Sequence, residues 1–190
     1  MTSVRILWLL LCLVWIAAEI SLARRAALQT GSAVNAERGS QRVLWISILA
    51  SLALALWFKN LAWVPIRIDY LPRQALAMLL FASGLYLRYV AVTKLGRFFT
   101  TNVAIQQEHR LIKEGPYRWL RHPAYTGLLI ALFAAGVAMG DFVALALLLV
   151  PTFWAFTLRI DIEERMLLAE FGGVYADFCA STWRLIPWVY

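Results

Sequence analysis

The stretch that decides how this chain folds reads GPYRWLRHPAYTG over residues 115–127, and a second polar stretch, RIDIEE, follows over residues 159–164. Two apolar runs separate them, and most of the remaining chain is also apolar. Ionisable side chains are costly near a bilayer and tend to be functional where they occur there. An apolar hairpin would bring the two stretches together, which predicts a polar cofactor pocket at a membrane surface.

The composition is that of a polytopic membrane protein. The 190 residues are 62% hydrophobic, whereas soluble domains are typically about 45–50% apolar. The formal net charge is +7, and the basic residues flank apolar runs. This distribution indicates that the positive charges face membrane lipid headgroups and do not bind nucleic acid. Two distant cysteines, Cys12 and Cys179, and two histidines without a ligand cluster around them indicate no disulfide framework and no metal site.

Five apolar runs approach the roughly 20 residues that a membrane-spanning helix needs. They cover residues 6–22, 43–64, 73–92, 124–139 and 142–158. A cleaved signal peptide is an alternative for the first run, because Arg5 precedes it, but the length of the run favours a retained span. Pro123 suits a first helical turn and Asp141 a helix N-cap. The sequence predicts an all-α integral membrane protein with about five transmembrane helices and a helical hairpin over about 123–159.

The loops predict the orientation of this single membrane domain, which covers residues 1–190. Residues 160–178 are expected to form a C-terminal amphipathic helix that leaves the membrane and breaks near Gly172-Gly173. Arg88 lies near one end of its span, where its side chain can reach the interface. Most basic residues fall in the loops on one side. The positive-inside rule therefore places the N-terminus outside, with both polar stretches and the C-terminal helix in the cytosol.

The second polar stretch holds three candidate site residues. Arg159 and Glu163 are four residues apart and share a helix face, with Glu164 adjacent. Taken alone, such a pair is best interpreted as a structural ion pair at a membrane exit. Beside another polar stretch, an arginine fork can hold the carboxylate of a molecule whose apolar tail lies among the spans, and carboxylates can hold a cationic cofactor.

The first polar stretch gathers polar groups around a helix start. His122 alone would be a structural histidine, but RHPAY over residues 121–125 sets basic groups and a phenol around free N–H groups and a positive dipole end. HRLI at 109–112 alone indicates a solvated loop, and GPY at 115–117 alone indicates a turn.

Together these motifs resemble the isoprenylcysteine carboxyl methyltransferase family of integral membrane enzymes, which is related to the phospholipid N-methyltransferases. HRLI, GPY, RHPAY and the adjacent glutamates occur in order with family-like spacing, followed by Phe171-Gly172 and Tyr175, within residues 94–188. Residues 1–90 match only as generic spans. The short, five-span chain is similar to prokaryotic members, which implies a prokaryotic inner membrane.

The resemblance implies S-adenosyl-L-methionine as the methyl donor, bound by residues 94–190, with the three N-terminal spans of residues 1–93 on the substrate and lipid side. It implies O-methylation of the carboxylate of an isoprenylcysteine-like, prenylated or other lipophilic acceptor, with Arg159 as the catalytic residue. The implied cofactor-binding residues are Asn102, His109, Arg110, Leu111, Ile112, Tyr117, Arg121, His122, Pro123, Ala124, Tyr125, Glu163 and Glu164.

Other function classes remain open at this point. A phospholipid or amine N-methyltransferase needs a deprotonated acceptor, for which His109 or His122 could act as base, although Arg159 would disfavour an ammonium. An NADPH-dependent membrane sterol or enone reductase has a related C-terminal architecture. A non-enzymatic scaffold would have no use for the polar set. Neither the acceptor nor the oligomeric state has a signature in the sequence.

Overall fold

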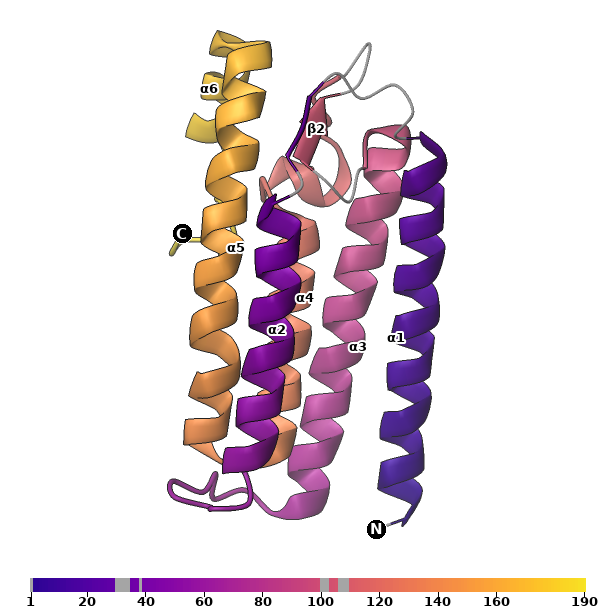
Figure 1. The fold of residues 1–190 in the computed structure, drawn as a ribbon, viewed down its shortest axis with the longest axis vertical. Coiled ribbons are helices and arrows are strands. Elements are labelled where there is room, and N and C mark those ends of the chain that lie inside the picture. The colour runs from indigo at the N-terminus through magenta and orange to yellow at the C-terminus, as the bar shows by residue number, and fades with distance from the viewer. Residues whose placement is uncertain (1, 30–34, 38, 100–102, 106–109) are drawn as a thin grey trace.

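The computed structural model describes residues 2–29, 35–37, 39–99, 103–105 and 110–190. Within them, five long helices run up and down side by side as an elongated bundle (Figure 1). These are α1 (Thr2–Gln29), α2 (Gly39–Phe58), α3 (Tyr70–Leu95), α4 (Pro123–Met139) and α5 (Phe142–Phe171), and the short helix α6 (Gly173–Ala180) follows. Helices α1, α2, α3 and α5 are long and apolar enough to cross a membrane, and α4 is shorter but also apolar. The predicted helical membrane architecture is confirmed.

Helices α3 and α4 approach each other at a pair of glycines. A Cβ atom added to Gly84 would lie 2.5 Å from the carbonyl oxygen of Gly127, and a Cβ on Gly127 would lie 2.5 Å from that of Gly84. Small residues let membrane helices pack until their backbones touch. This contact holds the first turns of α4, which begin within the RHPAY motif at Pro123, against α3.

Helices α4 and α5 form the predicted hairpin, and its closed end is capped as expected. Pro123 occupies the first turn of α4. Asp141 caps α5, because one carboxylate oxygen accepts from the N–H groups of Val143 at 2.9 Å and Ala144 at 3.0 Å. Its other oxygen accepts from the N–H of Val64 at 2.8 Å. The buried Asp141 therefore also ties the connector between α2 and α3 to the hairpin.

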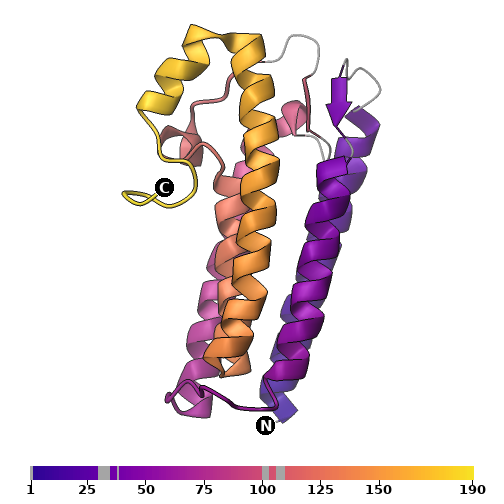
Figure 2. The same ribbon diagram turned by 60° about the vertical axis from the view of Figure 1, so that its left-hand side comes forward.

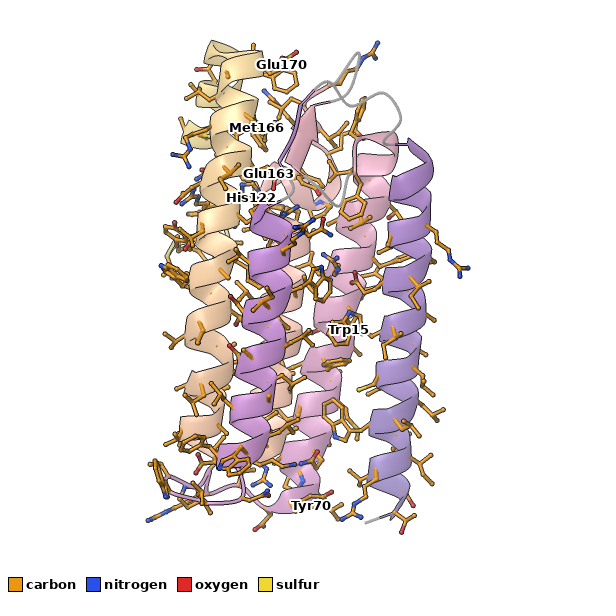
Figure 3. All side chains as sticks on the ribbon, in the orientation of Figure 1. Trp15, Tyr70, His122, Glu163, Met166 and Glu170 are labelled. Carbon is orange, nitrogen blue, oxygen red and sulfur yellow. The ribbon has the colours of Figure 1, made fainter. Side chains whose placement is uncertain are left out.

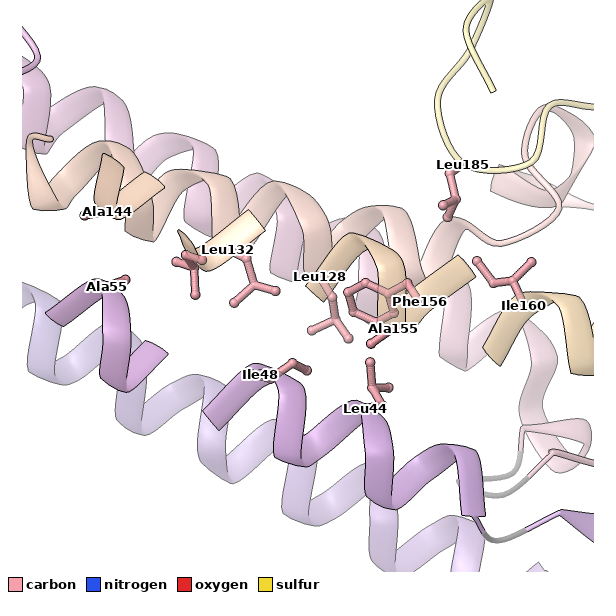
Figure 4. Packing of buried hydrophobic residues seen from close by; sticks show 11 residues of the cluster. Leu44, Ile48, Ala55, Leu128, Leu132, Ala144, Ala155, Phe156, Ile160 and Leu185 are labelled. Carbon is pink, nitrogen blue, oxygen red and sulfur yellow. The ribbon is translucent and has the colours of Figure 1, made fainter. Parts of the chain in front are cut away.

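The main apolar core lies between α2 and the hairpin. Figure 4 shows Leu44 and Ile48 of α2 facing Leu128 of α4 and Phe156 of α5, and these residues belong to one buried cluster. The cluster forms because α2 packs along α5, and it continues to Ile160 near the polar end of the bundle.

Within the described residues, helix α1 packs mainly against α3. The rings of Trp8 and Trp15 meet Phe81 edge-on, with centroid separations of 5.4 and 5.8 Å. Most other α1 side chains are exposed, as expected for a helix whose outer surface faces lipid.

A short two-stranded ribbon at the polar end of the bundle was not predicted. Strands β1 (Asn35–Glu37) and β2 (Val103–Ile105) pair antiparallel, with Asn35 opposite Ile105. Both segments were expected to be polar loops. Two 3-10 turns, η2 (Gly96–Phe98) and η3 (Gly115–Arg118), lie in the connection between α3 and α4. The pairing satisfies backbone N–H and C=O groups that no helix uses.

Helix α5 runs beyond the predicted hairpin end at residue 159. It stops at Gly172, whose φ of 52° lies in the left-handed region that glycine tolerates. The predicted break near Gly172-Gly173 is therefore confirmed, and α6 begins directly after it.

The C-terminal segment, residues 181–190, folds back onto the start of α4. The N–H of Arg121 donates to the carbonyl of Trp183 at 2.8 Å, and that of His122 to the carbonyl of Arg184 at 3.2 Å. The hydroxyl of Thr126 donates to the carbonyl of Leu185 at 2.7 Å. From there the segment projects sideways from the bundle (Figure 2).

Candidate functional site

A cavity of about 360 Å³ lies at the end of the bundle where α4 begins. Small-molecule sites typically enclose about 300–1,000 Å³. All five long helices contribute to its walls, as does the connection before α4. Its lining includes ten of the predicted site residues: Arg110, Leu111, Ile112, Tyr117, Arg121, His122, Ala124, Tyr125, Arg159 and Glu163. Asn102 and His109 lie outside the described residues.

One hydrogen-bonded line joins the two polar stretches. The hydroxyl of Tyr125 donates to a carboxylate oxygen of Glu163 at 3.0 Å and accepts from Nε of Arg159 at 2.8 Å. Nη1 of Arg159 also donates to the hydroxyl of Ser40 at the start of α2, at 3.1 Å. Arg159 is only 4% exposed. Its charge is therefore held at a defined position on the cavity wall.

His122 lies between two carboxylates. Its Nε2 is 3.0 Å from Oε1 of Glu164, and its Nδ1 is 3.9 Å from Oε1 of Glu163. Figure 3 shows His122 and Glu163 close together near the polar end of the bundle. His122 is the N-cap residue of α4 and both carboxylates come from α5, so these contacts join the two helices of the hairpin.

The adjacent glutamates have different surroundings. Glu163 lines the cavity, whereas Glu164 lines a neighbouring surface pocket. Glu164 accepts from Nε of Arg121 at 2.8 Å and pairs with Nη2 of Arg184 at 2.9 Å, in addition to its contact with His122. Glu164 therefore lies outside the cavity lining and holds Arg121 and His122, which do line the cavity. Pro123 also lies off the cavity lining, where it opens α4.

Tyr117 contributes a buried phenol beside the polar line. Its hydroxyl donates to the carbonyl of Ala91 on α3 at 3.4 Å. Burial, and then the negative charge of Glu163, raise the pKa of Tyr117 well above its ordinary value. The phenol is therefore neutral at physiological pH and adds no negative charge to the cavity.

An ion pair between α1 and α3 lies on the cavity wall and was not predicted. Arg88 does not reach an interface as expected but is 9% exposed and pairs with Glu19, with Nη2 and Oε2 at 2.8 Å. Nε1 of Trp15 donates to Glu19 at 3.2 Å. The sequence feature that could have indicated this ion pair is Glu19 itself, an acidic residue within an apolar run. No comparable signal marked Ser40 or Arg184.

Away from these groups the cavity is apolar. Its α2 wall runs from Gln41 to Ile48, about 10 Å along the helix axis at 1.5 Å per residue. Leu44 and Leu128 face it from the buried core, and Trp45 from a half-exposed position. The cavity therefore has a polar head and an apolar shaft that extends into the membrane bundle.

Fold and site define a multi-pass helical membrane protein with a cavity that is polar at one end and apolar along its shaft. More particularly, the chain belongs to the isoprenylcysteine carboxyl methyltransferase family, because the model of that family matches residues 75–169, half of the chain. The resemblance carried by the sequence motifs is confirmed. The match includes α4, nearly all of α3 and α5, and the polar line between them.

Individual relatives agree with this assignment. The chain is 33% identical over 97 residues to a protein-S-isoprenylcysteine O-methyltransferase of Schizosaccharomyces pombe, covering 50% of this chain and 41% of that one. It is 32% identical over 108 residues to protein-S-isoprenylcysteine O-methyltransferase B of Arabidopsis thaliana, covering 56% and 55%. The chain thus spans about half the length of these curated relatives.

A solved structure shares the fold. The eukaryotic intramembrane Ras methyltransferase of this family superposes with a TM-score of 0.61 at 23% identity, covering 76% of this chain and 52% of that chain. At this identity the likeness supports the helical membrane fold.

Proposed function

We propose that this protein is an S-adenosyl-L-methionine-dependent methyltransferase that O-methylates the carboxylate of an isoprenylcysteine-like or other lipophilic acceptor. The observation that carries the proposal is the line Arg159–Tyr125–Glu163, which sets a cation and an anion on the wall of one cavity with an apolar shaft. Membership of the family and the names of the relatives support it.

The residues present fit the methyl donor. S-adenosyl-L-methionine carries a sulfonium and an ammonium, and the Glu163 carboxylate, whose side chain is 30% exposed, offers them a negative charge on the cavity wall. Leu111, Ile112 and Met166 provide apolar surface for a planar base. Bound there, the cofactor supplies a methyl group already activated by the sulfonium charge.

The acceptor end needs positioning more than acid–base chemistry. A carboxylate is ionised at neutral pH, so it needs no general base. Arg159 holds it by charge-assisted hydrogen bonds, while the Tyr125 and Ser40 contacts hold the guanidinium in place. The apolar shaft accommodates the lipophilic tail and excludes water. Alignment and water exclusion are then the main contributions to rate.

The same geometry supports a division of labour along the chain. Residues 94–190 supply the polar groups proposed for the methyl donor, and residues 1–93 supply Leu44, Trp45 and Ile48 of the apolar shaft. The start of α1 lies at the end of the bundle opposite the start of α4 (Figure 1), and the cavity is lined by residues at the start of α4. With the basic loops in the cytosol, the cavity faces the cytosol of a prokaryotic inner membrane and the N-terminus lies outside.

The first test is cofactor binding by detergent-purified protein. Equilibrium with labelled S-adenosyl-L-methionine should give saturable binding that excess unlabelled cofactor displaces, and NADPH should neither bind nor compete. Saturable binding of NADPH without binding of the methyl donor would instead identify a reductase.

The second test identifies the bond formed. The protein is incubated with S-adenosyl-L-methionine that carries a labelled methyl group and with an S-farnesylated cysteine that bears a free carboxylate. The matching carboxamide serves as the control acceptor. We expect label in the carboxylate product only, and mild base should release it as methanol, because an ester hydrolyses. Base-stable label on an amine headgroup would point to N-methylation.

A further inference from the structure

Apolar side chains gather on the C-terminal segment and on the turn before α4. Trp188 is 84% exposed and Val189 76%, and Trp119 is also largely exposed. Trp183 connects them, because its N–H donates to the carbonyl of Trp119 at 3.0 Å and its ring lies 5.2 Å from that of Trp188. Clustered apolar exposure of this kind marks an interaction surface.

The backbone holds Trp188 outward. Its φ of 62° lies in the left-handed region, which is disfavoured for a bulky residue. The turn is nevertheless closed by hydrogen bonds, with the N–H groups of Leu185 and Ile186 donating to the carbonyl of Tyr190 at 2.8 and 2.7 Å. A strained, hydrogen-bonded turn that exposes an indole indicates a use for the exposed ring.

The position of the turn identifies its partner as the bilayer. The segment leaves the bundle sideways, close to the first turn of α4 (Figure 2). The apolar part of α4 begins at this first helical turn. The C-terminal segment beside it therefore lies at the boundary between water and hydrocarbon. Tryptophan is enriched at this boundary. The exposed guanidinium of Arg118 lies 4.8 Å from the Trp119 ring, which suits an anionic headgroup.

We propose that Trp188 and Val189, with Trp119, insert into the headgroup–acyl boundary of the membrane that the bundle spans. Because the same segment hydrogen-bonds the backbone of Arg121 and His122, the insertion sets the depth of the cavity wall relative to the lipid. This anchoring does not depend on which reaction takes place in the cavity.

The test measures depth directly in the full chain. Cys12 and Cys179 are replaced by Ala, Trp188→Cys is labelled with an environment-sensitive fluorophore, and the protein is reconstituted into vesicles of zwitterionic and anionic phospholipids. Asp177→Cys on exposed α6 serves as the aqueous control. Val150→Cys, a 66% exposed position within α5, serves as the hydrocarbon control.

We expect the label at 188 to emit at shorter wavelength than at 177 and to lose more intensity to nitroxides near the headgroup than to nitroxides deep in the acyl chains. The label at 150 should show the reverse order. Should the label at 188 be quenched by aqueous iodide as at 177, the anchor does not exist. Protection from both lipid-borne and aqueous quenchers would mean that a second copy covers the turn, which also overturns the proposal. Val189→Cys gives the same readout if Trp188→Cys does not fold.

Discussion

The hydroxyl of Tyr125 donates to Glu163 at 3.0 Å while it accepts from Arg159 at 2.8 Å, so one phenol joins the anion and the cation of the cavity. Tyr125 comes from the first turn of α4, and both of its partners come from α5, one helical turn apart. The proposed methyl-donor and acceptor subsites are therefore mechanically connected, and substitutions along this line should separate their roles.

Tyr125→Phe should lower kcat/KM. The substitution keeps both charges but removes two hydrogen bonds to charged groups, each worth about 1.5–3 kcal/mol, so a decrease of about ten- to a hundredfold per bond is expected in methyl-transfer kinetics. Tyr86→Phe, at a 71% exposed position on α3, is the matched control. Equal kinetics for the two variants would show that the phenol does not organise the site.

Glu163→Gln should weaken binding of S-adenosyl-L-methionine. A hydrogen bond to a charged group contributes about 1.5–3 kcal/mol, so Kd should rise roughly ten- to a hundredfold in calorimetry. Glu170→Gln, exposed two turns further along α5 (Figure 3), controls for the loss of one negative charge. An unchanged Kd for Glu163→Gln would refute the assigned role.

Arg159→Ala should abolish most turnover while leaving methyl-donor affinity largely intact. Removing one partner of a buried hydrogen-bonded charge pair costs about 2–5 kcal/mol, which corresponds to at least about a thirtyfold loss in kcat/KM. Arg159→Lys keeps the positive charge but lacks the planar guanidinium, so it should restore only part of the kcat/KM that Arg159→Ala loses. If cofactor affinity fell as far as turnover, Arg159 would not be an acceptor residue.

Gly127→Ala should destabilise the bundle. The new methyl group would meet the backbone of Gly84, which cannot move aside as a flexible side chain can. Overpacking of this kind costs about 1–3 kcal/mol and should lower the midpoint of thermal unfolding in detergent. Gly173→Ala is the control, because a Cβ there has no neighbour within 4 Å. Equal midpoints for both variants would argue against the close contact.

Glu19→Leu should cost more stability than the double variant Glu19→Leu/Arg88→Leu. The single variant leaves the Arg88 charge buried without its carboxylate, a cost of about 3–5 kcal/mol, whereas removing both charges relieves it. Thermal unfolding of the two variants side by side makes the comparison. A double variant that is less stable than the single one would show that the unpaired charge of Arg88 is not what destabilises the single variant.

Much of the architecture could be predicted because apolar length and helix-end residues are local properties. The hairpin, the Asp141 cap and the break at Gly172 follow from the residues at those positions. The pair Glu19–Arg88 could not be predicted, since its partners are 69 residues apart and neither position specifies the other. The ribbon of β1 and β2 was missed for the same reason, because strand pairing depends on which loops meet.

The amino-acid sequence by itself determined the membrane-spanning helices, the family and the set of polar residues at one end of the bundle, because hydrophobicity and motif spacing are written along the chain. Only the tertiary structure decided how those residues divide. It turned Glu163 toward the cavity and Glu164 toward Arg121 and Arg184, and it placed the C-terminal segment against the start of α4. Neighbouring residues on a helix point in different directions, so their surroundings depend on what packs against each face.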